Sequence, residues 1–490
     1  MKQHFFKLGK NTIIYGVGTM LTRFISLLLL PLFTAYLTPA DFGVIALLAL
    51  LGAVLQPIFS LGLNAGMGPC YFENNNEKRK ATTVWTAFSL LSASSLCLVT
   101  IAWLFPEILS RLLFQKPDYS WLVSLSVTGV ALNILSTPFR MRLQFEEKAV
   151  WFVTLTLVST LVTISLSVLM VVGMEWGVQG IILGQLIGFL INMLLFMFFS
   201  SRFTRFYLDK SIGEELLRLG LPLVPSFAFL FILMQSNQYI LKWFRGLDEV
   251  GIYSIGFRLG MVMTVVVGAF QTAWYPFFMS YMTRQDEAKI LFGRIFTYYI
   301  FGVGSLSLLF FIFAKPIVMI LTQPEFHSAY QVVGLSASAQ FFSGLFILLV
   351  PGIYFAKELK YVSIIQGTAA FISLILNITL ISWIGLFGAG LALCLGYLTM
   401  VIFQQAWNRM RQSDYIEIVY EWRRVFKFAV LYLLIAVISL LKRDWTLLHE
   451  SFFSAMLFVL LLVAVYRFFD LSEREFAWAL PRRVFARILS

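Results

Sequence analysis

Residues 41–64 read DFGVIALLALLGAVLQPIFSLGLN, an apolar stretch whose charged side chain is Asp41, at its start. A helix needs about 20 predominantly apolar residues to cross the hydrocarbon core of a bilayer, and this stretch is long enough. Stretches of the same kind recur along the whole chain. We place membrane spans near residues 12–36, 41–64, 81–105, 119–137, 150–173, 177–200, 217–241, 250–274, 290–314, 329–350, 361–384, 386–407, 425–441 and 451–469.

The composition agrees with this segmentation. The chain has 490 residues, of which 59% are hydrophobic and 13% charged, and its mean hydropathy is +0.84. These values are typical of a polytopic membrane protein, so we expect an all-α fold with about 14 transmembrane helices. Cys70, Cys97 and Cys394 show no paired spacing, and the three histidines are dispersed. The sequence therefore predicts no disulfide framework, metal site or cofactor.

The net charge of +12 reflects orientation in the membrane. Most of the 37 Lys and Arg lie at the N-terminus and in the alternate loops on the same side of the predicted membrane. By the positive-inside rule, both termini are expected in the cytoplasm. Nucleic acid is therefore not an expected partner. The first apolar stretch is too long for the core of a signal peptide and is predicted to be a retained span.

The chain contains an internal repeat. Gly43, in LTPADFGV at 37–44, aligns with Gly251, in GLDEVGI at 246–252, which lies 208 residues later. GVQG at 177–180 and GLFG at 385–388 match at the same spacing. The repeat holds six spans, so we predict two six-helix lobes related by a pseudo-two-fold axis along the membrane normal. The expected domains are an N-terminal lobe at 1–208, a C-terminal lobe at 209–416, and two extra helices with a cytoplasmic tail at 417–490.

Two arginines, Arg23 and Arg258, fall in the middle of predicted spans, whereas all 25 Asp and Glu fall in loops or at span ends. An arginine at mid-membrane costs about 2.5–3.5 kcal/mol on insertion scales and needs a partner. One interpretation is that the substrate is an anion and brings the counter-charge, since guanidinium binds phosphate oxygens bidentately. The other is a structural arginine capped by carbonyls or water. The repeat does not relate the two arginines, so they are expected to bind one anion from different lobes.

Several segments resemble the polysaccharide-biosynthesis flippases of the Wzx type, in the multidrug/oligosaccharidyl-lipid/polysaccharide (MOP) exporter superfamily. The matching segments are LTPADFG at 37–43, LGLNAGMGPCYF at 61–72, GLPLVPSF at 220–227, EVGIYSIGFRLG at 249–260, AFQTAWYPFF at 269–278 and GLFGAG at 385–390. The resemblance covers nearly the whole chain. In the lipid II flippase, a relative, cavity arginines on the same two spans serve the substrate, and this sequence matches at Arg23 and Arg258.

The resemblance implies a non-enzymatic flippase of the bacterial cytoplasmic (inner) membrane. Its substrate would be an undecaprenyl-pyrophosphate-linked oligosaccharide, moved to the outer leaflet by alternating access for O-antigen, capsule or exopolysaccharide synthesis. Membrane lipids, a polysaccharide polymerase and chain-length machinery are the implied partners. Many relatives carry an acid in the seventh span, where this chain reads QSNQY at 235–239.

Neutral polar residues are further candidates for substrate binding. Gln56, Ser60 and Asn64 are spaced four apart and would form one stripe on a helix. Such a stripe either hydrogen-bonds sugar hydroxyls or joins helices.

The late parts of the seventh and eighth spans, and a proline in the first span, supply further candidates. Asn237 and Gln238 lie late in the seventh span, and Gln271 and Trp274 late in the eighth. Trp274 either stacks on a sugar or anchors the helix at the interface. Pro31 can bend the first span, and such a bend would move Arg23, which is a hypothesis about gating. The alternative is a kink that does not move.

Two other functions fit the sequence less well. A drug or cation exporter of the same superfamily calls for buried acids, whereas the Asp and Glu of this sequence fall in loops or at span ends. A polysaccharide polymerase or ligase calls for a large outer loop bearing an active site, and the longest outer connection runs only from about 315 to 328. The sequence has no Ser/His/Asp set and no GxxxxGK[ST] loop, which argues against an enzyme.

Overall fold

The computed structural model describes residues 14, 16–18, 20–22, 24–73, 76–201, 207–281, 285–356, 358, 360–410, 418–441 and 445–468. Regular secondary structure within these ranges is helical. The chain divides into two compact units. The first unit comprises residues 1–255, 321–326 and 366–393, and the second comprises 256–320, 327–365 and 394–490.

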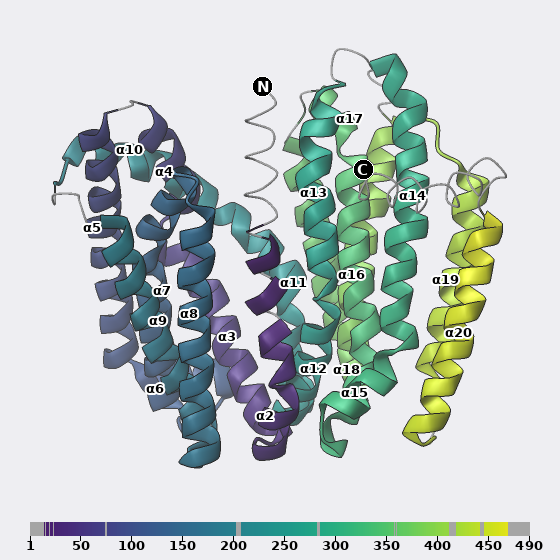
Figure 1. Cartoon of the computed structure of the whole chain (residues 1–490), viewed down its shortest axis with the longest axis horizontal. Helices are drawn as coiled ribbons and strands as arrows, with labels where there is room; N and C mark the ends of the chain where they lie inside the picture. Colours follow the sequence, from purple (N-terminus) through teal and green to yellow (C-terminus); the bar gives the residue numbers. More distant parts are fainter. Residues whose placement is uncertain are drawn as a thin grey trace, which may run out of the picture. The chain divides into compact units, whose positions relative to one another are not determined.

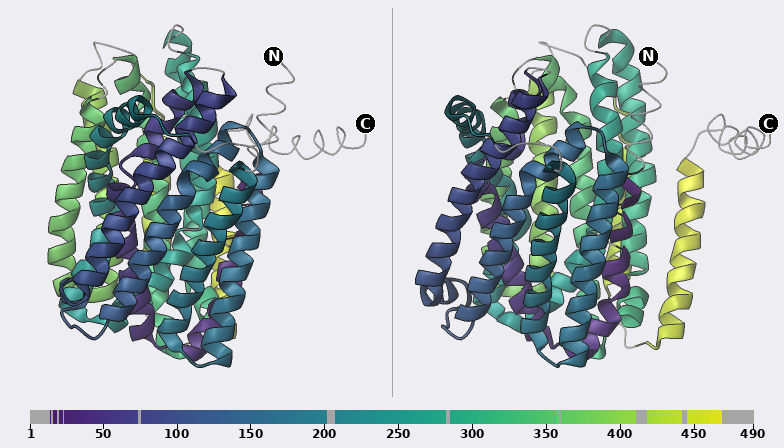
Figure 2. Two further views of the ribbon diagram at one scale, coloured as in Figure 1. Left: turned by 90° about the vertical axis from the view of Figure 1, so that its left-hand side faces the viewer. Right: turned by 60° about the vertical axis from the view of Figure 1, so that its left-hand side comes forward.

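The first unit is built of long, roughly parallel helices (Figure 1). Its helices are α2 (Leu30–Tyr36), α3 (Pro39–Phe59), α4 (Leu63–Phe72), α5 (Glu77–Leu104), α6 (Pro106–Phe114), α7 (Ser120–Phe145), α8 (Ala149–Val168) with the π-helical η1 (Leu169–Gly173), α9 (Gly177–Ser201), α10 (Lys210–Gly220), the 3-10 turn η2 (Leu221–Leu223) and α11 (Val224–Arg245). The short helices α4 and α10 lie at one end of the long helices and α6 lies at the other (Figure 2).

The second unit is also helical. Its helices are α13 (Met263–Met279), α14 (Gln285–Ile312), α15 (Ala314–Leu321, which ends in the first unit), α16 (Tyr330–Leu349), α17 (Pro351–Phe355), α19 (Trp422–Leu440) and α20 (Leu447–Phe468). The 3-10 turn η3 (Pro324–Ala329) precedes α16. Like α15 and η3, the helices α12 (Leu247–Gly260) and α18 (Lys360–Met410) contribute residues to both units.

Ten helices in the described part of the chain are long and apolar enough to cross a membrane, and the bent pair α12 and α13 makes an eleventh span. The helix α18 has 51 residues and contains non-helical residues at Ile384 and Gly385. A helix of that length measures about 76 Å, more than twice the hydrocarbon core, so α18 accounts for two spans. The break confirms the predicted turn between spans 361–384 and 386–407. The total of fourteen stays a prediction.

The LTPAD motif is a helix start. Thr38 and Asp41 form a capping box, in which the Asp41 amide donates to Thr38 Oγ1 at 3.2 Å and the Thr38 amide donates to Asp41 Oδ2 at 2.9 Å. Pro39 takes the first turn, where its missing amide hydrogen costs nothing. The motif therefore sets where α3 begins.

The repeat-matched glycines pack against each other's helices. A Cβ on Gly43 would meet the carbonyl of Leu247, and a Cβ on Gly251 would meet the carbonyl of Pro39. Pro39 and Leu247 are themselves 208 residues apart, so the contact is reciprocal. Reciprocal contacts of this kind are what a two-fold relation produces. Only glycine allows the two backbones to approach so closely.

Helix boundaries follow the same spacing. Pro39 and Leu247 begin α3 and α12, Glu77 and Gln285 begin α5 and α14, and Pro106 and Ala314 begin α6 and α15. Each pair is 208 residues apart. The repeat that weak sequence matches indicated is thus present in the secondary structure.

Two predicted spans are broken. The helix predicted over 41–64 ends at Phe59, because Leu61 and Gly62 have positive φ angles of 54° and 66°, and α4 starts at Leu63. Gly62 and Gly220 approach each other's backbones there, which holds α10 against the break. The helix predicted over 250–274 is interrupted after Gly260 and bends by 43°.

Candidate functional site

Arg258 lies on α12, two residues before that helix ends. It is eleven residues from Leu247, or about 16 Å along the axis, which is roughly half the thickness of the hydrocarbon core. Its side chain is exposed in the structure, and it makes no hydrogen bond or ion pair with any described residue. The guanidinium group is therefore available to a ligand.

The local fold explains why a cation is tolerated at this depth. Gly256 and Gly260 let α12 pack closely on α16, where an added Cβ would meet the carbonyl of Ala329 or Val333. The helix then stops, and its last carbonyls form the negative end of the helix dipole beside Arg258. A helix end within the membrane thus replaces part of the counter-charge that a carboxylate would supply.

Arg23 lies outside the described residues. Pro31 is the second residue of α2, and the helical segment before it is interrupted at Leu29. The interruption is a single residue, because Leu29 has αR backbone angles and its carbonyl accepts from the Phe33 amide, so it does not show a bend at Pro31. Whether the helix bends there during a transport cycle stays a hypothesis.

The stripe of Gln56, Ser60 and Asn64 does not lie on one helix. Gln56 is near the end of α3, Ser60 lies in the break with its hydroxyl donating to the Pro57 carbonyl at 3.1 Å, and Asn64 lies on α4. Ser60 is buried and Asn64 is exposed. The positive φ angles at Leu61 and Gly62 divide the predicted stripe.

Gln56 instead belongs to a polar cavity inside the first unit. The cavity has a volume of about 260 Å³ and lies between α3, α7 and α9. Its polar lining residues are Gln56, Ser126, Asn133 and Gln185. The Asn133 amide donates to Gln56 Oε1 at 3.4 Å. These groups are neutral donors and acceptors, which suit a hydroxyl group or water.

Arg140 is a polar residue of this region that was not predicted from the sequence. The span was predicted to end at residue 137, but α7 continues to Phe145 through Pro138. Arg140 Nη1 donates to Asn133 Oδ1 at 3.4 Å, and its guanidinium carbon lies 5.8 Å and 5.9 Å from the rings of Phe152 and Phe196. Arg140 therefore supports the wall of the polar cavity. The apolar residues Phe139 and Leu143 were the available sign that the helix continues.

Asn237 and Gln238 are buried and use their polar atoms within the first unit. The Asn237 side-chain amide donates to the Tyr253 hydroxyl, and Gln238 Nε2 donates to Gln235 Oε1 at 2.8 Å. On the neighbouring α18, Asn377 donates to the Ser373 carbonyl at 2.8 Å, while its Oδ1 is buried without a partner. This cluster joins α11 to α12.

Gln271 and Trp274 lie on α13. Gln271 is half-buried and has no hydrogen-bond partner among the described residues. Trp274 is buried among phenylalanines of the second unit, and its indole NH donates to the Ile347 carbonyl at 3.2 Å. A ring in this position packs the core and is not open to a sugar.

One carboxylate is buried in the described part of the chain. Glu450, in the first turn of α20, is 2% exposed and pairs with Lys315 at 2.5 Å. The pair fixes the first turn of α20 to the start of α15. No three His, Cys, Asp or Glu side chains among the described residues come together as a metal-ligand set.

Solved structures similar to this chain include membrane transporters. The lipid II flippase MurJ in an inward closed conformation matches with a TM-score of 0.69 and 15% identity, over 93% of this chain and 99% of that chain. An inward-facing multidrug resistance MATE family transporter of the MOP superfamily matches with a TM-score of 0.68 and 13% identity, over 79% and 94%. The MATE multidrug transporter DinF-BH matches with a TM-score of 0.60 and 16% identity, over 83% and 95%. These likenesses show the fold, and the fold class is that of a polytopic MOP-type transporter.

The sequence comparison identifies the family. The family model described as polysaccharide biosynthesis protein matches residues 8–282, more than half of the chain. The chain therefore belongs to this family. No curated protein sequence matches the chain significantly. The resemblance inferred from the motifs is confirmed at the level of the family, and the fold agrees with it.

Proposed function

We propose that this protein is a flippase that moves polyprenyl-pyrophosphate-linked oligosaccharide units across the bacterial cytoplasmic membrane by alternating access. The units would serve surface polysaccharide synthesis. Family membership supports a role in polysaccharide biosynthesis, and the transporter fold supports movement across the membrane. The main support for an anionic substrate is Arg258, whose guanidinium is exposed, has no partner among the described residues and lies halfway along a span.

The physical chemistry of a pyrophosphate suits Arg258. Guanidinium binds phosphate oxygens through paired, charge-assisted hydrogen bonds worth about 1.5–3 kcal/mol each. An inside-negative potential also favours outward movement of negative charge, by about 2.3 kcal/mol per charge per 100 mV. A buried coupling carboxylate is therefore not required by energetics.

The purified full-length chain in liposomes tests this function. The liposomes contain a fluorescent polyprenyl-pyrophosphate oligosaccharide, and an impermeant quencher measures its transfer between leaflets. Arg258→Ala should slow transfer at least tenfold, since losing one charge-assisted interaction costs about one power of ten or more. Arg258→Lys should keep part of the rate because its charge remains, although a lysine binds as a point charge.

Arg111→Ala is the matched control. Arg111 is an exposed arginine on α6 whose partner is Glu107, four residues before it. Its removal should leave the transfer rate unchanged. Full transfer by a folded Arg258→Ala protein contradicts the proposal. Transport of cationic dyes by the wild-type protein without lipid transfer supports the drug-exporter alternative instead.

A further inference from the structure

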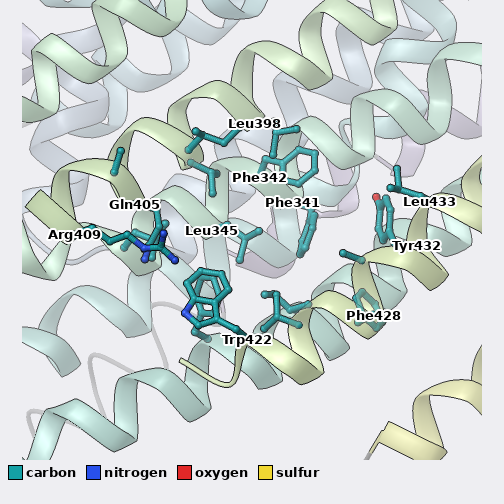
Figure 3. A pocket seen from close by; sticks show the side chains of 18 residues that line it. Phe341, Phe342, Leu345, Leu398, Gln405, Arg409, Trp422, Phe428, Tyr432 and Leu433 are labelled. Atoms are coloured by element: carbon teal, nitrogen blue, oxygen red, sulfur yellow. The ribbon is translucent and has the colours of Figure 1, made fainter. Parts of the chain in front are cut away.

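The second unit contains a crevice that the proposed transport function does not use (Figure 3). Its volume is about 570 Å³, and α14, α16, the second half of α18 and α19 form its walls. The size is within the range of about 300–1,000 Å³ that small-molecule sites occupy. Except for a few polar groups, the lining side chains are aliphatic or aromatic.

One end of the crevice is apolar and closed by Tyr432. The Tyr432 hydroxyl is within 2.8 Å of Ser307 Oγ and 2.6 Å of Ser338 Oγ, so its polar atom is already bonded. The lining residues Ile402 and Leu433 are 55% and 64% exposed, so the crevice opens to the outside of the protein. Ile402 belongs to a helix that is long and apolar enough to cross a membrane, and Leu433 belongs to the predicted span 425–441, so the opening is expected to face hydrocarbon.

The other end carries a cation. Arg409 and Trp422 lie at the same end of the crevice (Figure 3). The guanidinium carbon of Arg409 is 5.6 Å from the ring centroid of Trp422. Arg409 is exposed and has no ion-pair partner among the described residues. Beside it in the lining, Gln405 Oε1 is buried and accepts no hydrogen bond. This end therefore offers a cation that can bind an anion. It also offers the Gln405 Oε1 atom, which can accept a hydrogen bond from a ligand.

The length of the crevice matches one leaflet. Trp422 and Leu433 lie on the same helix, eleven residues apart, which is about 16 Å. Half of the hydrocarbon core is about 15 Å. The charge distribution predicts that the loop between Asn408 and Arg424 is cytoplasmic, so Arg409 lies at the level of the inner-leaflet headgroups. Trp422, at the same end, is the residue type that anchors at this interface.

We propose that the crevice holds one anionic glycerophospholipid of the cytoplasmic leaflet. The phosphate pairs with Arg409, a headgroup hydroxyl donates to Gln405 Oε1, and one acyl chain follows α19 toward Tyr432. Charge complementarity selects this occupant, since a neutral apolar molecule leaves Arg409 and Gln405 without partners. The lipid is a resident of the second unit and is distinct from the transported cargo.

Lipid retention tests the proposal. The full-length protein is exchanged from nanodiscs that contain equal phosphatidylglycerol and phosphatidylcholine with the same acyl chains, and native mass spectrometry counts the lipids that remain bound. The wild-type chain should keep one phosphatidylglycerol, preferred about tenfold over phosphatidylcholine. Arg409→Gln should abolish the preference. Ala429→Trp, which fills the crevice from its exposed lining, should abolish retention of both lipids.

Arg423→Gln is the matched control, because Arg423 is an exposed arginine of the same helix end that does not line the crevice. It should retain the wild-type preference. A phosphatidylglycerol with a photoreactive acyl terminus should label peptides that contain Phe341 or Tyr432. Unchanged selectivity in Arg409→Gln, or labelling elsewhere, overturns the proposal. Displacement of the lipid by one equivalent of polyprenyl pyrophosphate overturns it too, since the crevice then belongs to the cargo.

Discussion

At the scale of single residues, two arginines on the long helices have different surroundings. Arg258 has no partner among the described residues and lies at a helix end, where the dipole offsets part of its charge. Arg140 lies against two phenylalanine rings and donates to Asn133. The first arrangement leaves the guanidinium available, whereas the second occupies it. Only the first therefore suits an exchangeable anion.

Glu146 predicts a pH dependence of stability. Burial alone would raise the pKa of Glu146, but hydrogen bonds from Lys148 and Arg142 outweigh it and hold the pKa below its ordinary value. Because the folded pKa lies below the unfolded one, this stability is present above about pH 4.3 and is lost as the pH falls through the folded value. The melting temperature should therefore fall below about pH 4. Thermal unfolding in detergent from pH 7 to pH 3 measures it.

Two variants separate this carboxylate from general acid unfolding. Glu146→Gln should lower the melting temperature at pH 7 and reduce its dependence on acid. Glu107→Gln, which removes a 66% exposed carboxylate, should change neither. An identical acid profile in wild type and Glu146→Gln contradicts the assignment.

The close packing at Gly251 predicts that a larger side chain at this position destabilises the protein. The added methyl group of Gly251→Ala would meet the Pro39 carbonyl, and overpacking of this kind costs about 1–3 kcal/mol. The variant should therefore unfold at a lower temperature. Gly268→Ala is the control, since nothing lies within 4 Å of its added Cβ. Equal stability of Gly251→Ala and wild type would mean that α3 and α12 separate readily.

At the scale of elements, the two helices beyond the repeat are held by polar contacts. Tyr432 of α19 bonds Ser307 and Ser338, and Ser454 of α20 donates to the Ile312 carbonyl at 2.6 Å. Between apolar helices in a membrane, such contacts specify position where hydrophobicity alone does not. The extra helices are therefore fixed parts of the second unit.

The Lys315–Glu450 pair predicts how firmly α20 is attached. Glu450→Ala leaves Lys315, which is 15% exposed, without its acid, and breaking a buried pair costs about 3–5 kcal/mol. The double variant Lys315→Met/Glu450→Leu should recover most of that loss, because it leaves no unpaired charge. Thermal unfolding of both variants measures the difference. Equal loss in the two variants would show that packing and not charge is responsible.

At the scale of the whole molecule, the orientation in the membrane is a prediction that still has to be tested. The positive-inside count places Lys210 in the cytoplasm and Gln115 outside. In a Cys97→Ser background, where Cys70 and Cys394 are buried, an impermeant maleimide should label Gln115→Cys on intact spheroplasts. Lys210→Cys should react only after permeabilisation. The reverse pattern would invert the topology and place the Arg409 end of the crevice outside.

The sequence by itself determined the all-helical membrane class, the 208-residue repeat and the family. Hydropathy, helix caps and glycine motifs depend on residues that are close together in the chain, so each can be recognised from the sequence. Arg258 was found in this way, since an arginine inside an apolar stretch is visible in the sequence.

Only the tertiary structure decided which polar groups have partners. It divided the stripe of Gln56, Ser60 and Asn64, buried Trp274 in the core, paired Glu450 with Lys315, and placed Arg409 over Trp422 at the end of a crevice. These outcomes depend on residues far apart in the chain, and on backbone breaks at Gly62 and Gly260 that hydropathy does not record. Whether a charged side chain is free to bind a ligand depends on its neighbours in space, and those neighbours are set by the fold.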